Sequence, residues 1–226
     1  DQPRALNRFV DVENFRNEGA TMLAASIHLS RGTPYIYMGE EIGMVDPDYD
    51  SMEDYVDVES LNAYQTLLAE GQSPEAAFRI IKAKSRDNSR TPMQWDDSVN
   101  AGFTTGTPWL KAGKSYPIIN VENEIKGPIF SFYQKLIALR KELPIIAEGS
   151  YQPAYEDSPQ VYAFEREWQG QKLLVLNNFY ADPITVDILP DYQNGQVLLS
   201  NYGKAQIDHV LTLQPYETLA ILVVEN

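Results

Sequence analysis

The sequence predicts an α/β segment followed by an all-β domain. Three observations support this fold class. A helical pattern leads into a short β-branched and aromatic run, and a long acidic connection follows with helix signals of its own. From Gly149 onward, short apolar runs are separated by turn residues. We place the boundary between the two domains after residue 147.

The first segment has the pattern of one helix and one strand. A helix is predicted over residues 14–30, because apolar and small residues recur on one face before Gly32 provides a stop. That face comprises Phe15, Gly19, Met22, Leu23, Ser26 and Ile27. The run 33–38 is predicted to be a buried strand. In barrels of α/β units, loops that follow such strands build the functional sites.

Further helices are predicted over 58–70, from Ser73 onward, and over 129–140, where Pro144 ends the pattern. Six strands of an antiparallel sandwich or barrel are then predicted, at 161–168, 172–179, 184–189, 196–199, 209–213 and 218–224. Aromatic residues of this domain favour core and cross-strand packing, with a sugar-binding platform as the alternative. They are Tyr151, Tyr155, Tyr162, Trp168, Tyr192 and Tyr202.

A single strand has no sheet to join, and a closed α/β barrel needs eight strands and about 250 residues. We therefore interpret residues 1–147 as the last quarter of a (β/α)8 barrel, with a long helical insertion after its last strand. The earlier strands are expected outside this chain. Residues 148–226 are expected to form a C-terminal antiparallel β-sandwich.

Composition narrows the classes of partner. The 226 residues are 43% hydrophobic and 11% aromatic, which is ample for a packed core. The net charge of −14 argues against nucleic acid and anionic membranes as partners. No run of about 18 apolar residues and no leader peptide is visible, so we expect a cytoplasmic location. With no cysteine, thiolate metal sites are excluded, and we expect no metal and no cofactor.

The segment 84–95, called here the arginine loop, is polar and irregular yet contains Trp95. On residue types alone, a solvated loop with one anchoring Trp is the favoured interpretation. The alternative is a binding surface, because arginine forks suit hydroxyl- and carboxylate-rich ligands and indole faces suit sugar rings.

Four motifs in order shift the balance toward a binding surface: Asp-Gln-Pro-Arg at 1–4, the run 32–44, the arginine loop, and Asn-Ala-Gly-Phe-Thr at 100–104. Together they resemble the α-glucosidases of glycoside hydrolase family 13, in the group of oligo-1,6-glucosidases, dextran glucosidases and trehalose-6-phosphate hydrolases. The resemblance covers essentially the whole chain. It implies a retaining, exo-acting enzyme that releases terminal α-linked glucose from an oligosaccharide or a disaccharide phosphate.

The resemblance assigns roles to four residues. Asp1, at the end of the seventh strand, matches the carboxylate that stabilises the transition state. Arg90 would bind the hydroxyls of the terminal glucose together with an aspartate from an early barrel loop. Arg86 would support the loop or reach the next subsite. For Arg4, a structural pairing with a barrel acid and a substrate role are equally expected.

The catalytic nucleophile and the acid/base of the family follow the fourth and fifth strands, outside this chain. We therefore expect the chain alone to be inactive and to need the N-terminal barrel portion as a partner. Asp46, Asp48 and Asp50 are spaced like calcium ligands but lack the rest of that pattern. A phosphorylated substrate would need cations such as Lys82, Lys84, Arg86 and Lys111. A non-catalytic sugar-binding or structural accessory domain is the alternative from another class.

Overall fold

The computed structural model describes residues 2–224, and packing divides the chain into two compact units. One unit joins the residues up to Arg8 to Met38–Gly127, and the other joins Phe9–Tyr37 to the part from Pro128 onward. These units reflect packing within this chain. The boundary after residue 147 stays a prediction.

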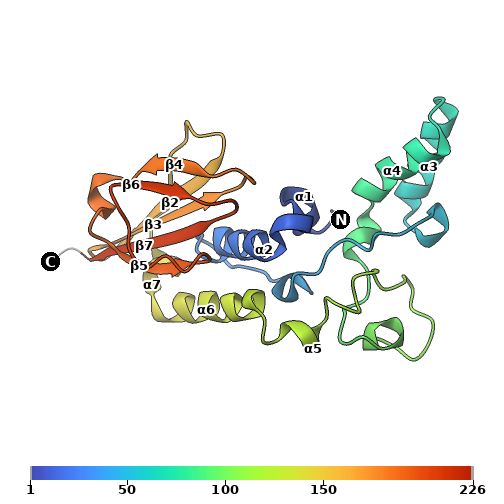
Figure 1. Ribbon diagram of the computed structural model, residues 1–226, viewed down its shortest axis with the longest axis horizontal. Coiled ribbons are helices and arrows are strands. Elements are labelled where there is room, and N and C mark those ends of the chain that lie inside the picture. The colour runs from blue at the N-terminus through green and yellow to red at the C-terminus, as the bar shows by residue number, and fades with distance from the viewer. Residues whose placement is uncertain (1, 225–226) are drawn as a thin grey trace. The chain divides into compact units, whose positions relative to one another are not determined.

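The second unit is built on two antiparallel sheets (Figure 1). Five strands follow the order β1-β2-β3-β7-β5, and two more form the pair β4-β6. Their bounds are Gln152–Ala154 (β1), Val161–Trp168 (β2), Gln171–Asn178 (β3), Ile184–Asp187 (β4), Gln196–Ser200 (β5), Val210–Leu213 (β6) and Thr218–Val224 (β7). A short 3-10 turn, Pro190–Tyr192, links β4 to β5. The predicted antiparallel all-β domain is therefore confirmed.

Both faces of the central strand β3 are buried. Leu174 and Leu176 join the core cluster that the pair β4-β6 covers through Val186 and Leu211. Neighbouring residues of a strand point to opposite faces of the sheet. Leu173 and every second residue after it therefore pack on the opposite face of the five-stranded sheet, and helices contact this face. The result is three layers: a strand pair, the five-stranded sheet and helices.

The helices of that third layer are α2 (Val12–His28), α6 (Pro128–Glu142) and α7 (Pro144–Glu148). The predicted face of α2 is largely buried, but Ile27 is exposed, so that assignment was wrong. The buried face instead centres on small residues, which allow close packing. A Cβ on Gly19 would clash with the Val10 side chain.

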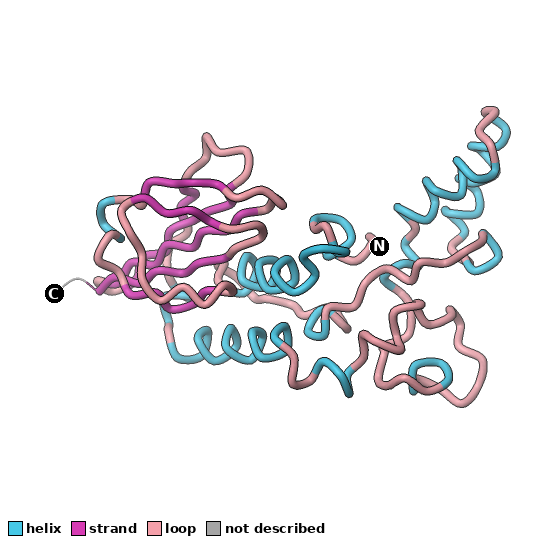
Figure 2. The backbone as a smooth tube through the Cα atoms, viewed as in Figure 1, coloured by secondary structure: helices cyan, strands magenta, loops and turns pink. Residues whose placement is uncertain are grey.

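The first unit is helical and irregular (Figure 2). Its helices are α1 (Ala5–Phe9), which runs to the unit boundary, α3 (Val58–Ala69), α4 (Pro74–Lys84) and α5 (Val121–Glu124). Four 3-10 turns lie between them: Glu40–Ile42, Met52–Asp54, Arg86–Ser89 and Val99–Gly102. As predicted, Ser73 caps α4, since its side chain accepts a hydrogen bond from the Ala76 amide at 3.2 Å.

Two strand predictions need correction. The run 33–38 is not a strand in this chain, and it is not buried: Tyr35 is 83% exposed. A strand needs a neighbouring ladder, and every ladder among the described residues is antiparallel and lies within 152–224. Conversely, β1 was missed because Pro153 lowers strand propensity, although an edge strand tolerates proline.

Within residues 2–224, no helix combines the length and apolar character needed to cross a membrane.

Candidate functional site

The arginine loop begins where α4 ends. Ser85 terminates α4 and starts the 3-10 turn Arg86–Ser89, in which its hydroxyl accepts a hydrogen bond from the Asp87 amide at 3.2 Å. This turn places Arg86 and Arg90 four residues apart at its two ends. Both arginine side chains are partly exposed, at 31% and 28%.

A single carboxylate lies between the two arginines. Oδ1 of Asp57 is 2.5 Å from Nη2 of Arg86 and 3.7 Å from Nη1 of Arg90. Oδ2 accepts hydrogen bonds from both the amide and the hydroxyl of Ser60, at 3.0 and 2.9 Å. Burial alone would raise the pKa of Asp57, but the hydrogen bonds from Arg86 and Ser60 outweigh it and lower the pKa. Asp57 is therefore an anion in this cluster at neutral pH.

Asp87 stabilises the 3-10 turn Arg86–Ser89 through a buried side chain. Its side chain is fully buried, and Oδ2 accepts hydrogen bonds from the amides of Val56 and Asp57 at 2.8 and 2.9 Å. Oδ1 lies 3.9 Å from Nη1 of Arg90. The same carboxylate thus fixes the backbone that presents Asp57 and contributes negative charge beside Arg90.

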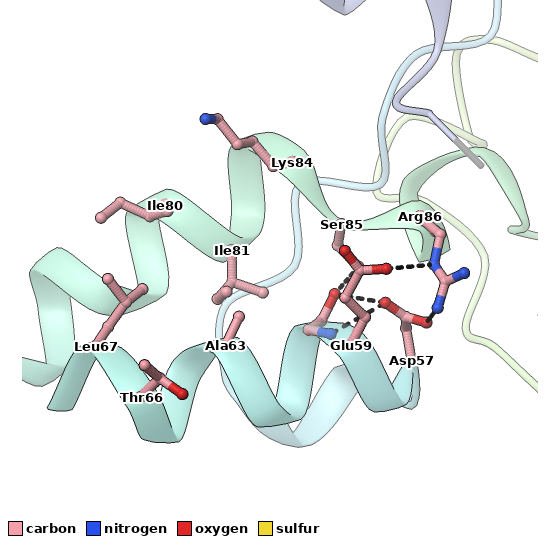
Figure 3. Close-up of a pocket in the computed structure, with 11 residues that line it drawn as sticks. Asp57, Glu59, Ala63, Thr66, Leu67, Ile80, Ile81, Lys84, Ser85 and Arg86 are labelled. Carbon is pink, nitrogen blue, oxygen red and sulfur yellow. Dashed lines mark hydrogen bonds and ion pairs between the residues drawn. The ribbon is translucent and has the colours of Figure 1, made fainter. Parts of the chain in front are cut away.

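Two cavities meet at Arg86. One, of about 490 Å³, runs between α3 and α4, with apolar walls and a polar end formed by Asp57, Glu59 and Arg86 (Figure 3). The other, of about 580 Å³, shares Glu59, Lys84 and Arg86, and is also lined by Gln2 and Pro3. The structure therefore brings the residues that follow Asp1 to the same cavity as Arg86.

Arg4 is buried, and two of its hydrogen bonds reach residues far away in the sequence. Its backbone amide donates to Oδ1 of Asp46 at 2.9 Å, and its Nη1 donates to the Met38 carbonyl at 2.9 Å. Both contacts are internal to the first unit and connect distant stretches of chain. Asp1, the fourth predicted site residue, lies outside the described residues.

Three of the four cations considered for a phosphate are paired with carboxylates. Lys82 pairs with Asp48, Lys111 with Asp54, and Arg86 with Asp57 and Glu59. The Lys84 side chain points away from the Asp57–Arg86 pair in Figure 3. Asp46, Asp48 and Asp50 each contact a protein group: the Arg4 amide, Lys82 and Lys114, respectively. Among residues 2–224, no group of three or more acidic or histidine side chains is arranged to hold a metal ion.

The six aromatic residues named above for a sugar-binding platform have different surroundings. Tyr192 is in the core, whereas Tyr151 and Tyr162 are partly exposed and meet hydroxyl to hydroxyl at 3.1 Å. Tyr155 and Tyr202 each donate to a backbone carbonyl, of Asp187 and Pro215 respectively, at 2.8 Å. Packing and local hydrogen bonding account for most of this set.

Asp57 was missed from the sequence. It precedes α3 and has Ser60 three residues later, which is the pattern of a helix N-cap, and its side chain does accept from the Ser60 amide. That signal predicts a cap. Its pairing with arginines about thirty residues further along has no local signature.

Comparison with known proteins gives a consistent assignment. Residues 1–149 match the α-amylase catalytic domain, and residues 161–219 match the C-terminal domain of the α-amylase SusG. The chain is 45% identical over 228 residues to an oligo-1,6-glucosidase of Halalkalibacterium halodurans, covering 98% of this chain and 41% of that protein. It is 43% identical over 225 residues to a trehalose-6-phosphate hydrolase of Bacillus subtilis, covering 97% and 40%.

A solved structure shows the same fold. The crystal structure of Bacillus licheniformis trehalose-6-phosphate hydrolase superposes with a TM-score of 0.94 at 43% identity, over 100% of this chain and 42% of that one. The chain thus spans about two fifths of the length of these relatives. On the match over residues 1–149, the chain belongs to the α-amylase family of catalytic domains, glycoside hydrolase family 13.

Proposed function

We propose that this chain is the C-terminal part of a retaining, exo-acting α-glucosidase that removes terminal α-linked glucose from short oligosaccharides. One observation carries the proposal: Arg86 lines a cavity that the residues next to Asp1 also line, and it pairs with Asp57, whose carboxylate lies 3.7 Å from Arg90. Relatives named oligo-1,6-glucosidase and trehalose-6-phosphate hydrolase, at 43–45% identity, support it.

Within this proposal, Arg90 binds hydroxyls of the terminal glucose and Asp1 stabilises the oxocarbenium-like transition state. A guanidinium offers hydrogen-bond donors in a fixed fork, which suits adjacent hydroxyl groups. Arg86 supports the loop through Asp57 or contacts the next sugar. Arg4 acts structurally, as its two hydrogen bonds to Asp46 and Met38 suggest.

We also propose that the first part of the chain belongs to a barrel. Residues 1–147 are the last quarter of a (β/α)8 barrel, and 33–38 form its eighth strand once the preceding strands are present. The exposure of Tyr35, Ile36, Tyr37 and Met38 supports this, since a large apolar run without a ladder normally has a partner.

The chain alone is proposed to be inactive. Retaining hydrolysis needs a nucleophile and an acid/base about 5–5.5 Å apart. In this family both follow earlier strands, which this chain does not match.

The contacts of the cations also bear on which substrate the parent enzyme hydrolyses. The pairing of Lys82, Lys111 and Arg86 with carboxylates favours an uncharged oligosaccharide over a sugar phosphate. Trehalose-6-phosphate is the second candidate, because a relative with that activity in its name is 43% identical to this chain. An accessory sugar-binding domain is the third, and would require affinity of this chain alone for oligosaccharides.

The test is a substrate panel on the parent chain, meaning this sequence joined to its N-terminal barrel portion. We expect hydrolysis of isomaltose above maltose and trehalose-6-phosphate. Arg90→Lys keeps the charge but loses the fork, and should lower kcat/KM by about 100-fold, or roughly 3 kcal/mol. Arg79→Lys, on the exposed face of α4, is the matched control and should stay within about twofold. A parent chain that hydrolyses none of the three substrates would refute the proposed function.

A further inference from the structure

Asp46 connects two stretches of chain that the proposed active site needs together. Its backbone amide donates to Oδ1 of Asn7 at 2.7 Å, and its own Oδ1 accepts from the Arg4 amide at 2.9 Å. Its Oδ2 accepts from Nδ2 of Asn88 at 3.2 Å. One residue is therefore bonded to the N-terminal segment on one side and to the arginine loop on the other.

Asn88 occupies the centre of the arginine loop, between Arg86 and Arg90. Its Nδ2 also donates to the Lys82 carbonyl at 2.8 Å, and its side chain is buried. Its Oδ1 accepts a hydrogen bond from the Tyr55 hydroxyl at 3.5 Å. Asp46 is thus the charged acceptor among the three groups that orient this amide. Any displacement of Asp46 would be passed to the turn that carries both arginines.

We propose that Asp46 is a positioning residue that sets the arginine loop against the segment of residues 2–7. Arg4 and Asn88 are 84 positions apart in sequence, yet they bind the two oxygens of one carboxylate. A planar carboxylate fixes both partners in one geometry, which a pair of separate contacts would not do. Since small misplacements of substrate-binding groups lower rates steeply, this link controls how the segment 2–7 and Arg90 lie against one substrate.

The electrostatic setting agrees with this role. Burial raises the pKa of Asp46, and the contacts with Arg4 and Asn88 oppose that rise. By contrast, Asp48 is a surface acid, 65% exposed, that pairs with Lys82 and Lys114. The two acids are two residues apart, so Asp48 offers a matched control for charge removal in the same segment.

The effect on structure is tested first, by amide hydrogen exchange on the 226-residue chain. In Asp46→Asn, the remaining oxygen can still accept from the Arg4 amide. The new amide nitrogen then faces Nδ2 of Asn88, so the hydrogen bond between residues 46 and 88 is lost. We expect exchange of peptides covering 86–90 to accelerate about tenfold, whereas Asp48→Asn leaves them unchanged. Unchanged exchange in Asp46→Asn would overturn the proposal, whatever the activity of the parent enzyme.

The effect on activity rests on the proposed function and is tested in the parent chain by a double-mutant cycle. Asp46→Asn and Asn88→Ala should each lower kcat/KM about tenfold, measured well below the melting temperature. If both act through one link, the double variant should lose about tenfold and not 100-fold. Full additivity would overturn the link, because a purely structural role couples the melting temperatures and not kcat/KM. A wild-type parent without activity would refute the proposed function alone, leaving the exchange result to decide this inference.

Discussion

At the residue scale, Asp57 shows how one carboxylate serves helix, loop and candidate site. It caps α3 through the Ser60 amide and binds Arg86, and Arg90 lies within 3.7 Å. Its side chain is only 3% exposed, so water contributes little to its solvation. The charged form is stable because donors surround it, and its protonation must weaken several contacts together.

This predicts a specific pH dependence of stability. The donors around Asp57 lower its pKa in the folded chain below the ordinary value of 3.8. A group with a lowered folded pKa stabilises the fold above its unfolded pKa, and that contribution is lost as pH falls through the folded value. We expect the free energy of unfolding to fall as pH drops below about 5, and to fall less steeply in Asp57→Asn.

Urea unfolding at a series of pH values measures this difference. Asn at position 57 can still cap α3, so the variant removes the charge with little change to the helix start. Asp97→Asn, at an exposed position in the same unit, should keep the slope of the wild type. Parallel curves for wild type and Asp57→Asn would show that the carboxylate contributes nothing to the acid sensitivity.

Residue roles were only partly predictable from the sequence. The two arginines and the position of Arg4 stand out by their motifs, but Asp57 was missed and Asp46 was noticed only for its spacing with Asp48. Cap and spacing patterns are local. The links from Asp46 to Arg4 and Asn88 span 42 residues in each direction, and only the folded chain brings these groups together.

At the element scale, strand β2 holds the helical layer through Arg166. Its guanidinium is fully buried and donates to the carbonyls of Leu29, Ile146, Gly149 and Ser150. These lie just after α2, within α7 and in the connection to β1. Burial lowers the pKa of Arg166, with a smaller effect from Arg140 and Arg31, but an arginine stays charged at any ordinary pH.

Replacing Arg166 should therefore cost much more than a surface substitution. Arg166→Met leaves several buried carbonyls without a donor, and we expect a loss of about 3–5 kcal/mol in the free energy of unfolding. Arg140 also donates to three carbonyls, of His28, Ser30 and Gly32, but is partly exposed. Water can replace it, so Arg140→Met should cost about 1 kcal/mol. Denaturant unfolding measures the loss of unfolding free energy in both variants. Equal losses would contradict the role assigned to Arg166.

Elements with a strong local period were predicted well. The bounds of β2 and β7 match the predicted runs 161–168 and 218–224, because their apolar residues pack on both faces of the sheet. The run 33–38 carries an equally clear strand pattern but forms none here. A strand pattern in the sequence indicates that a segment suits a sheet. The segment forms a strand only if neighbouring strands are present to pair with it.

At the scale of the whole molecule, the exposed run 33–38 predicts the outcome of adding the N-terminal barrel portion. In this chain its backbone has no ladder, and Tyr35 is 83% exposed, so its amides should exchange rapidly. If the run is the eighth strand of a closed barrel, it gains a neighbour on each side. We expect exchange at 35–38 to slow by about 100-fold or more in the complemented protein.

Exchange measured before and after mixing the two parts tests this, with hydrolysis of an α-glucoside as the parallel readout. The loop 104–107, which is in the first unit and exposed for most of its length, is an internal control that should not change. Activity should appear only in the mixture, together with protection at 35–38, because on the proposed function a closed barrel would bring Arg90 to the nucleophile and the acid/base of the N-terminal portion. A mixture that hydrolyses the glucoside while 35–38 still exchanges rapidly would refute the eighth-strand assignment, since the site would then form without that strand.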